Sequence, residues 1–196
     1  MKEKEPRLSP RNKGKPMFPN RRSAVISITV VVFLLIFAGV AIDQNNVSRL
    51  KRYQEEANTY LDKGLDAMDV RLGYTKTLVG LLDDKGLAEP ITPLLDLYAR
   101  EQTPSSLSEL YISLDKELDL LQKKVFTHKQ YPLYAAYFEK IYDAEQEMAL
   151  YLNEYNDKAL YYNVQIGGFL ATLAAKRLGM QPLELFSVAP AIKGRP

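Results

Sequence analysis

Residues 24–42 read AVISITVVVFLLIFAGVAI, nineteen residues with no charge, no amide side chain, no proline and one glycine. As an α-helix this stretch would be about 28 Å long, close to the roughly 30 Å of a bilayer's hydrocarbon core. A core helix of a soluble protein carries a polar face, and this stretch has none. We therefore predict a transmembrane helix at residues 24–42, with the lipid bilayer as its partner.

The residues before this stretch are basic and rich in proline. Residues 1–22 contain eight basic and two acidic residues, a net charge of +6, together with four prolines. Such a composition cannot build a packed core, so residues 1–23 are predicted to form a basic, disordered tail. The positive-inside rule then predicts a cytoplasmic N-terminus and an extracytoplasmic position for the rest of the chain, at the cell membrane. A cleaved signal peptide is the alternative, but its apolar run is usually about 7–15 residues long, which favours an uncleaved anchor.

The chain beyond the apolar stretch has the composition of one globular domain. Residues 23–196 carry 18 basic and 22 acidic side chains, a net charge of −4, so the basic excess belongs to the tail. Nucleic acid is therefore not expected as a partner. The chain has no cysteine, which excludes disulfides, zinc fingers and thiol nucleophiles. Tyrosine is abundant, with 13 residues, and we expect leucine and tyrosine to form the core.

Apolar residues recur at helical spacing in three stripes. They lie at residues 47–82, at residues 107–128 in near-heptad spacing, and at residues 134–166. No proline separates the first stripe from the apolar stretch before it. One helix is therefore expected to leave the membrane and run into solvent.

Helix stop signals divide the C-terminal part of the chain. Gly167-Gly168 predicts a kink, after which the helix continues to Gly179. The apolar residues Leu183, Leu185 and Phe186 are expected to fold back on the bundle.

No alternating pattern of useful length appears outside residues 24–42, so the predicted fold class is all-α. We predict an N-terminal single transmembrane helix that leads into an antiparallel helix bundle at residues 43–186, followed by a flexible tail at residues 187–196. The bundle has four helices if the short segment 93–101 or the kinked C-terminal piece counts as the fourth. The spacing also permits an intermolecular coiled coil, but the prolines and loops favour a compact bundle.

Candidate groups for catalysis or metal binding are few. The one histidine, His128, ends the second stripe, and we expect a structural role because no nucleophile or orienting group accompanies it. A di-metal site in a bundle needs Glu-x-x-His pairs, whereas Val125 stands three residues before His128. Glu145 interrupts the third stripe, and it is interpreted as a buried polar position or an exposed edge. No catalytic, cofactor-binding or metal-ligating residue is predicted, and the chain is not expected to be an enzyme.

The tyrosines of the third stripe are expected in the core or at an interface more than around a cofactor. Tyr137, Tyr151 and Tyr161 fall off the stripe. If they are exposed, they indicate a surface for a protein partner.

A set of short motifs occupies the last third of the chain. They are Tyr131-Pro132, Tyr155-Asn156 and Tyr162-Asn163 seven residues apart, Ala174, Leu178-Gly179-Met180 and Phe186. Together they resemble the C-terminal signature of the LemA family, and Arg71 with Leu78-Val79 resembles the Arg…Leu-Val stretch of that family's first soluble helix. The chain looks like a divergent member, because Leu170 stands where that family has a proline. The resemblance implies a membrane-anchored helical bundle, with no established biochemical activity and no catalytic residue to carry over.

The repeated Tyr-Asn pair also has a physical interpretation. A spacing of seven residues places Tyr155 and Tyr162 on one helix face, with Asn156 and Asn163 one step round. We expect the tyrosines to fill the core and the asparagine amides to bond to a neighbouring helix.

These features favour a scaffold or protein-interaction module of the cell envelope. Its expected partners are other membrane or envelope proteins, and a homo-oligomer is not excluded by the sequence. The alternative is a sensor or small-ligand-binding module with a tyrosine-lined pocket between helices. A fully packed core would oppose that alternative.

Overall fold

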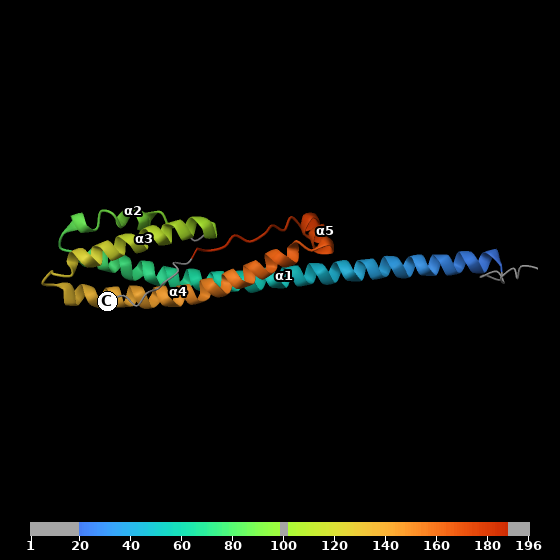
Figure 1. The fold of residues 1–196 in the computed structure, drawn as a ribbon, viewed down its shortest axis with the longest axis horizontal. Coiled ribbons are helices and arrows are strands. Elements are labelled where there is room, and N and C mark those ends of the chain that lie inside the picture. The colour runs from blue at the N-terminus through green and yellow to red at the C-terminus, as the bar shows by residue number, and fades with distance from the viewer. Residues whose placement is uncertain (1–19, 99–101, 188–196) are drawn as a thin grey trace, which may run out of the picture. The chain divides into compact units, whose positions relative to one another are not determined.

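The computed structural model describes residues 20–98 and 102–187. These residues form five α-helices, one short 3-10 helix and no strand, so the predicted all-α class is confirmed for them (Figure 1). The elements are α1 (Arg21–Leu81), η1 (Lys85–Leu87), α2 (Thr92–Asp96), α3 (Pro104–Val125), α4 (Tyr131–Ile166) and α5 (Phe169–Leu178). The tails predicted at residues 1–23 and 187–196 lie outside the described residues, except for residues 20–23 and 187. Residues 21–23 are helical and not disordered, because α1 already begins at Arg21.

The chain divides into two compact units, Met1–Gln44 and Asn45–Pro196. In the first unit, α1 begins at Arg21, three residues before the apolar stretch. Every large apolar side chain from Val25 to Ile42 is exposed, with Phe37 at 78% and Ile42 at 50%. Among the described residues, α1 is the one helix long and apolar enough to cross a membrane. The structure thus agrees with the predicted span in length, composition and exposure.

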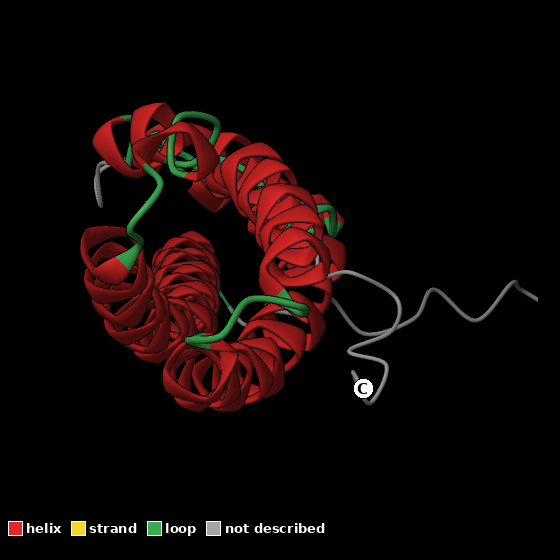
Figure 2. Ribbon diagram, turned by 90° about the vertical axis from the view of Figure 1, so that its left-hand side faces the viewer, coloured by secondary structure: helices red, strands yellow, loops and turns green. Residues whose placement is uncertain are grey.

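The second unit is a bundle of three long helices, formed by α3, α4 and the part of α1 beyond Gln44 (Figure 2). Contacts between α1 and α4 fix an antiparallel register: Glu56 pairs with Lys158, Gly64 faces Leu152, and Tyr74 lies under Lys140. Figure 1 shows that α3 runs in the same direction as α1, because the connection that holds η1 and α2 returns along the bundle.

The predicted stripes form the core of this bundle. In α4 all nine predicted stripe residues are buried: Tyr134, Phe138, Ile141, Met148, Leu152, Tyr155, Ala159, Tyr162 and Ile166. The α3 stripe is buried from Leu107 to Val125. His128 lies outside it, exposed in the connection to α4, because α3 already ends at Val125. The apolar periodicity therefore identified the buried faces correctly.

The shorter elements differ more from expectation. The helix expected at residues 93–101 is only α2, of five residues, so it adds little to the bundle. Gly167-Gly168 ends α4 instead of kinking it, because Gly168 takes an extended conformation and starts α5. The stop at Gly179 is confirmed: this residue is left-handed, with φ of 66°, and the Met180 amide reaches back to the Ala175 carbonyl at 3.0 Å.

Candidate functional site

The two Tyr-Asn pairs of α4 hold the segment that follows α5. This segment, residues 181–187, has no helix and runs back along the bundle (Figure 1). We call it the C-terminal strap. It is the part of the second unit that joins α4, α5 and α3.

Each asparagine binds one strap residue through both of its amide atoms. Asn163 Nδ2 donates to the Leu183 carbonyl at 2.8 Å, and the Leu183 amide donates to Asn163 Oδ1 at 2.7 Å. Asn156 forms the same pair of bonds with Phe186, at 2.7 and 2.8 Å. A side-chain amide that donates and accepts in this way replaces the neighbouring strand that an extended backbone would otherwise need.

The spacing of these bonds explains the seven-residue repeat. Seven residues of α-helix rise about 10.5 Å. Three residues of extended chain cover about 10 Å. Asn156 and Asn163 are seven residues apart on the helix, while Leu183 and Phe186 are three apart on the strap. The helix and the strap therefore stay in register across both contacts.

The paired tyrosines follow the same register. Tyr155 OH donates to the Glu184 carbonyl, and Tyr162 OH donates to the Gln181 carbonyl at 3.2 Å. Burial raises the pKa of Tyr155 to about 12 and also raises the pKa of Tyr162. Both hydroxyls therefore stay protonated at neutral pH, as a donor must.

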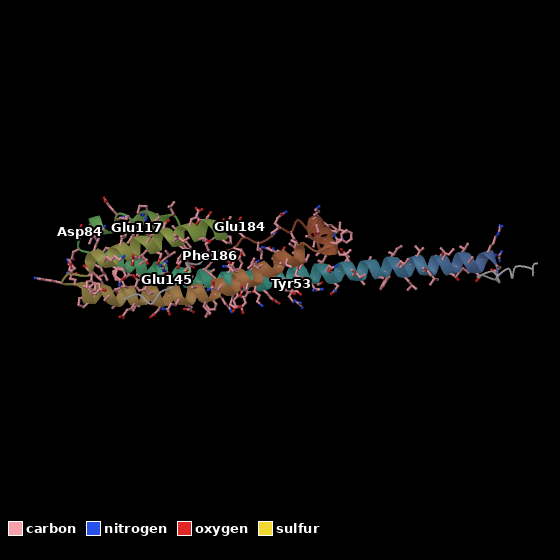
Figure 3. The ribbon with its side chains drawn as sticks, viewed as in Figure 1. Tyr53, Asp84, Glu117, Glu145, Glu184 and Phe186 are labelled. Atoms are coloured by element: carbon pink, nitrogen blue, oxygen red, sulfur yellow. The ribbon has the colours of Figure 1, made fainter. Side chains whose placement is uncertain are left out.

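The other side of the strap contacts α3. The Phe186 ring is 1% exposed and lies 6.3 Å from the Tyr111 ring, and the Ser187 amide donates to Ser108 Oγ at 2.8 Å. Figure 3 labels Phe186 and Glu184 on the strap. The predicted fold-back is thus confirmed for Phe186, whereas Leu185 points outward at 40% exposure.

The predicted partner of the asparagine amides is wrong. We expected a neighbouring helix, and the amides bond to the strap instead. A helix has few backbone groups left to offer, because its N–H and C=O groups bond within the helix. The signal that could have found the strap is the three-residue spacing of Leu183 and Phe186 after a helix stop.

A second cluster of polar side chains lies inside the bundle and links its three long helices. Arg71 of α1 donates to Asp115 of α3 at 3.0 Å and lies 3.6 Å from Glu145 of α4. Tyr111 of α3 donates to the other Glu145 oxygen at 2.8 Å, and its ring centroid is 5.1 Å from the Arg71 guanidinium carbon. Thr75 donates to the Arg71 carbonyl at 2.9 Å. Hydrogen bonds, opposite charges and an aromatic face together offset the cost of burying these charges.

The centre of this cluster is buried, and Asp115 at its edge is 21% exposed. Arg71, Tyr111 and Glu145 are all 0% exposed, and burial raises the pKa of Tyr111, with Glu145 adding to the effect. The buried alternative for Glu145 is therefore correct. The partners of Glu145 could not be predicted from the sequence, because Arg71 lies 74 positions away and Asp115 lies on a third helix. Within the described residues no group of three or more His, Asp or Glu could hold a metal ion.

The remaining tyrosines lie against cations or other rings. Tyr137 and Tyr151 are half-buried, and their rings lie 5.3 Å from Lys140 Nζ and 5.7 Å from Lys63 Nζ. Tyr161 is 48% exposed and packs edge-to-face on Tyr53 at 4.9 Å. Of the three tyrosines predicted to fall off the stripe, only Tyr161 is well exposed.

One open groove lies at the end of the bundle where α1 stops. It has a volume of about 510 Å³ and is formed by the end of α1, the following 3-10 helix and α2. Its lining combines apolar Val79, Ala88 and Pro93 with charged Lys85, Glu89 and Asp96. A smaller groove of about 240 Å³ lies between α2 and α3.

Comparison of the chain with models of protein families, with curated proteins and with solved structures finds no match in any of the three.

Proposed function

We propose that this protein is a membrane-anchored interaction module, whose bundle serves as a scaffold for other membrane or envelope proteins. Residues 24–42 provide the anchor, since their large apolar side chains are all exposed and need a nonpolar surrounding. The basic residues before them favour a cytoplasmic N-terminus, which places the bundle outside the cytoplasm.

One observation carries this proposal: the motif side chains of α4 are occupied by the chain's own backbone. Tyr155, Asn156, Tyr162 and Asn163 all bond to strap residues. A motif used in this way stabilises a shape and does not present groups to a substrate. A fixed shape on an anchored bundle suits a scaffold.

The same arrangement supports membership of the LemA family as a divergent member. Each motif that resembles that family has a structural role here: the Tyr-Asn pairs hold the strap, Gly179 ends α5, and Phe186 packs against Tyr111. Arg71, the motif residue of the first soluble helix, links three helices. Membership rests on these residues alone.

Binding of a small ligand in a tyrosine-lined pocket is less well supported. Tyr111, Tyr134, Tyr155 and Tyr162 are at most 1% exposed and pack in the core. No tyrosine lines the two grooves described above, and a third groove of about 190 Å³ has one tyrosine, Tyr131, in its lining.

The test is photocrosslinking in intact cells from single reactive residues. Positions Glu89 and Asp96 probe the groove at the end of α1, Tyr161 probes the exposed tyrosine, and Asn153 on the exposed face of α4 is the control. We expect a discrete adduct with one membrane protein from the groove or from Tyr161, and none from Asn153. Self-adducts alone would show a homo-oligomer, and an absence of discrete adducts would refute the interaction module.

A further inference from the structure

The most exposed large apolar side chains of the second unit lie at or next to α5. Phe169 is 82% exposed and Val164 is 72% exposed, the two highest values for large apolar side chains in the described part of the second unit. Leu170 and Leu173 are also exposed, at 48% and 57%. Phe169 and Leu173 are four residues apart on α5, so they share one face of the helix. Exposed apolar side chains gathered at one site mark an interaction surface.

The inner face of α5 fixes its position along α1. Ala175 of α5 packs in a cluster with Leu50, Tyr162 and Ile166, and Ala171 packs against this cluster. Leu50 follows Ile42, the last residue of the apolar stretch, by eight residues. Eight residues span about 12 Å as helix, and at most about 28 Å fully extended. This limit holds for any angle between the two units.

The opposite end of the bundle is much farther along α1. Tyr74 lies under Lys140, which is in the first turns of α4, and Phe126 precedes that helix. Tyr74 follows Ile42 by 32 residues, or about 48 Å of helix. Of the two ends of the bundle, the α5 end is therefore the one that the chain ties closest to residues 24–42.

Basic side chains surround the same end. Lys176 and Arg177 occupy the last turn of α5, and Arg49, Lys51 and Arg52 flank Leu50 on α1. A short helix with exposed apolar residues and adjacent cations is suited to the boundary between lipid headgroups and acyl chains, particularly where anionic lipid is present.

We propose that α5 lies on the surface of the bilayer that residues 24–42 span, with Phe169, Leu170 and Leu173 inserted below the headgroups and Lys176 and Arg177 facing lipid phosphates. This inference rests on the proposed anchor and adds a second membrane contact to it. It makes the bundle a body held at the membrane at two points, the anchor and α5.

The absence of tryptophan from the chain makes single-tryptophan probes unambiguous. We would place tryptophan by Phe169→Trp and, as a matched control at the other end, by Phe126→Trp, since Phe126 is also exposed, at 63%. Leu173→Trp is a second probe on the same α5 face. The full chain is reconstituted in vesicles of phosphatidylcholine and phosphatidylglycerol that contain lipids brominated at shallow or deep acyl positions.

We expect blue-shifted emission from the Phe169→Trp and Leu173→Trp variants, with several-fold stronger quenching by shallow than by deep bromine, and neither effect in Phe126→Trp. Replacing phosphatidylglycerol by phosphatidylcholine should reduce the quenching. Blue-shifted emission without quenching would mean that a second copy or another protein covers α5, and emission typical of water would mean that nothing covers it. Either result overturns the inference. Vesicle flotation after alkaline extraction tests the anchor separately, so a chain that floats but is not quenched refutes only the contact through α5.

Discussion

At the level of single residues, Arg71 carries a fully buried positive charge that needs partners inside the bundle. Its guanidinium is fully buried and reaches carboxylates on two other helices. Removing one partner of a buried ion pair leaves the other charge uncompensated, which costs about 3–5 kcal/mol. Glu145, also fully buried, would be the uncompensated group.

We expect Arg71→Met to lower the free energy of unfolding by about 3–5 kcal/mol. Adding Glu145→Gln should recover part of this loss, because glutamine is neutral and its Oε1 still accepts the hydrogen bond from Tyr111. Urea unfolding of the detergent-solubilised chain, followed by circular dichroism, measures both effects.

Arg52→Met is the control, since Arg52 is 62% exposed and pairs with Glu56 at 3.7 Å on the surface of one helix. Exposed pairs of this kind contribute about 0–1 kcal/mol. Equal losses for Arg71→Met and Arg52→Met would contradict a stabilising role for the buried cluster.

The asparagines Asn156 and Asn163 each hold the strap through two hydrogen bonds. Asn163→Ala removes two hydrogen bonds to Leu183, and at about 0.5–1.5 kcal/mol each the loss is about 1–3 kcal/mol. The Leu183 amide should then exchange its hydrogen faster, as measured by hydrogen-exchange mass spectrometry of the strap. Asn153→Ala, on the exposed face of the same helix, should leave that exchange unchanged. Unchanged protection in Asn163→Ala would show that the amide does not hold the strap.

At the level of elements, the packing of α1 on α4 depends on one glycine. A Cβ at Gly64 would lie 2.6 Å from Leu152 Cδ2 and 2.8 Å from Cγ. Leu152 is 0% exposed, so it has little room to move. We expect Gly64→Ala to destabilise the bundle by about 1–3 kcal/mol through overpacking.

Gly73 provides the matched comparison on the same helix, because a Cβ there would meet nothing within 4 Å. Gly73→Ala should stabilise the helix by about 0.5–1 kcal/mol, since alanine loses less backbone entropy than glycine. Thermal unfolding of the two variants should shift in opposite directions. A shift in the same direction would mean that helix propensity outweighs the contact between α1 and α4.

The sequence was sufficient to predict the long helices, but it was insufficient to predict the segments between them. A stripe of period 3.6 predicted the buried faces of α3 and α4, because burial repeats with every turn of a helix. The helix expected at residues 93–101 has only five residues as α2, since a segment this short contains too few turns for a periodic pattern to mark its end. The strap has no periodic pattern, and its bonds join residues 20 and 30 positions apart. The apolar residues predicted that this segment folds back, but apart from the three-residue spacing of Leu183 and Phe186 its place depended on tertiary contacts that a single sequence does not display.

At the level of the whole molecule, the buried tyrosine hydroxyls make the bundle sensitive to alkali. The pKa of Tyr155 is raised by burial to about 12, and those of Tyr111 and Tyr162 are raised for the same first reason. A tyrosine in the unfolded chain has a pKa of about 10. Tyr155 therefore contributes stability that is fully present below about pH 10 and is lost as the pH rises to about 12, and Tyr111 and Tyr162 act in the same direction.

Tyr53 behaves in the opposite way, because hydrogen bonds with Tyr161 and then with Arg49 lower its pKa to about 8. It adds no stability below pH 8, and its contribution grows as the pH rises from about 8 to 10.

We expect an absorbance titration at tyrosinate wavelengths to show one early step near pH 8 with full helical circular dichroism, and then a cooperative loss of helix above pH 10 that releases the buried tyrosines together. Tyr53→Phe should remove only the early step, and Tyr155→Phe should leave that step in place while it alters only the alkaline unfolding. If the buried tyrosines ionised gradually near pH 10 with the helices intact, the strap contact would have to open in the folded protein, because an ionised Tyr155 cannot donate to the Glu184 carbonyl.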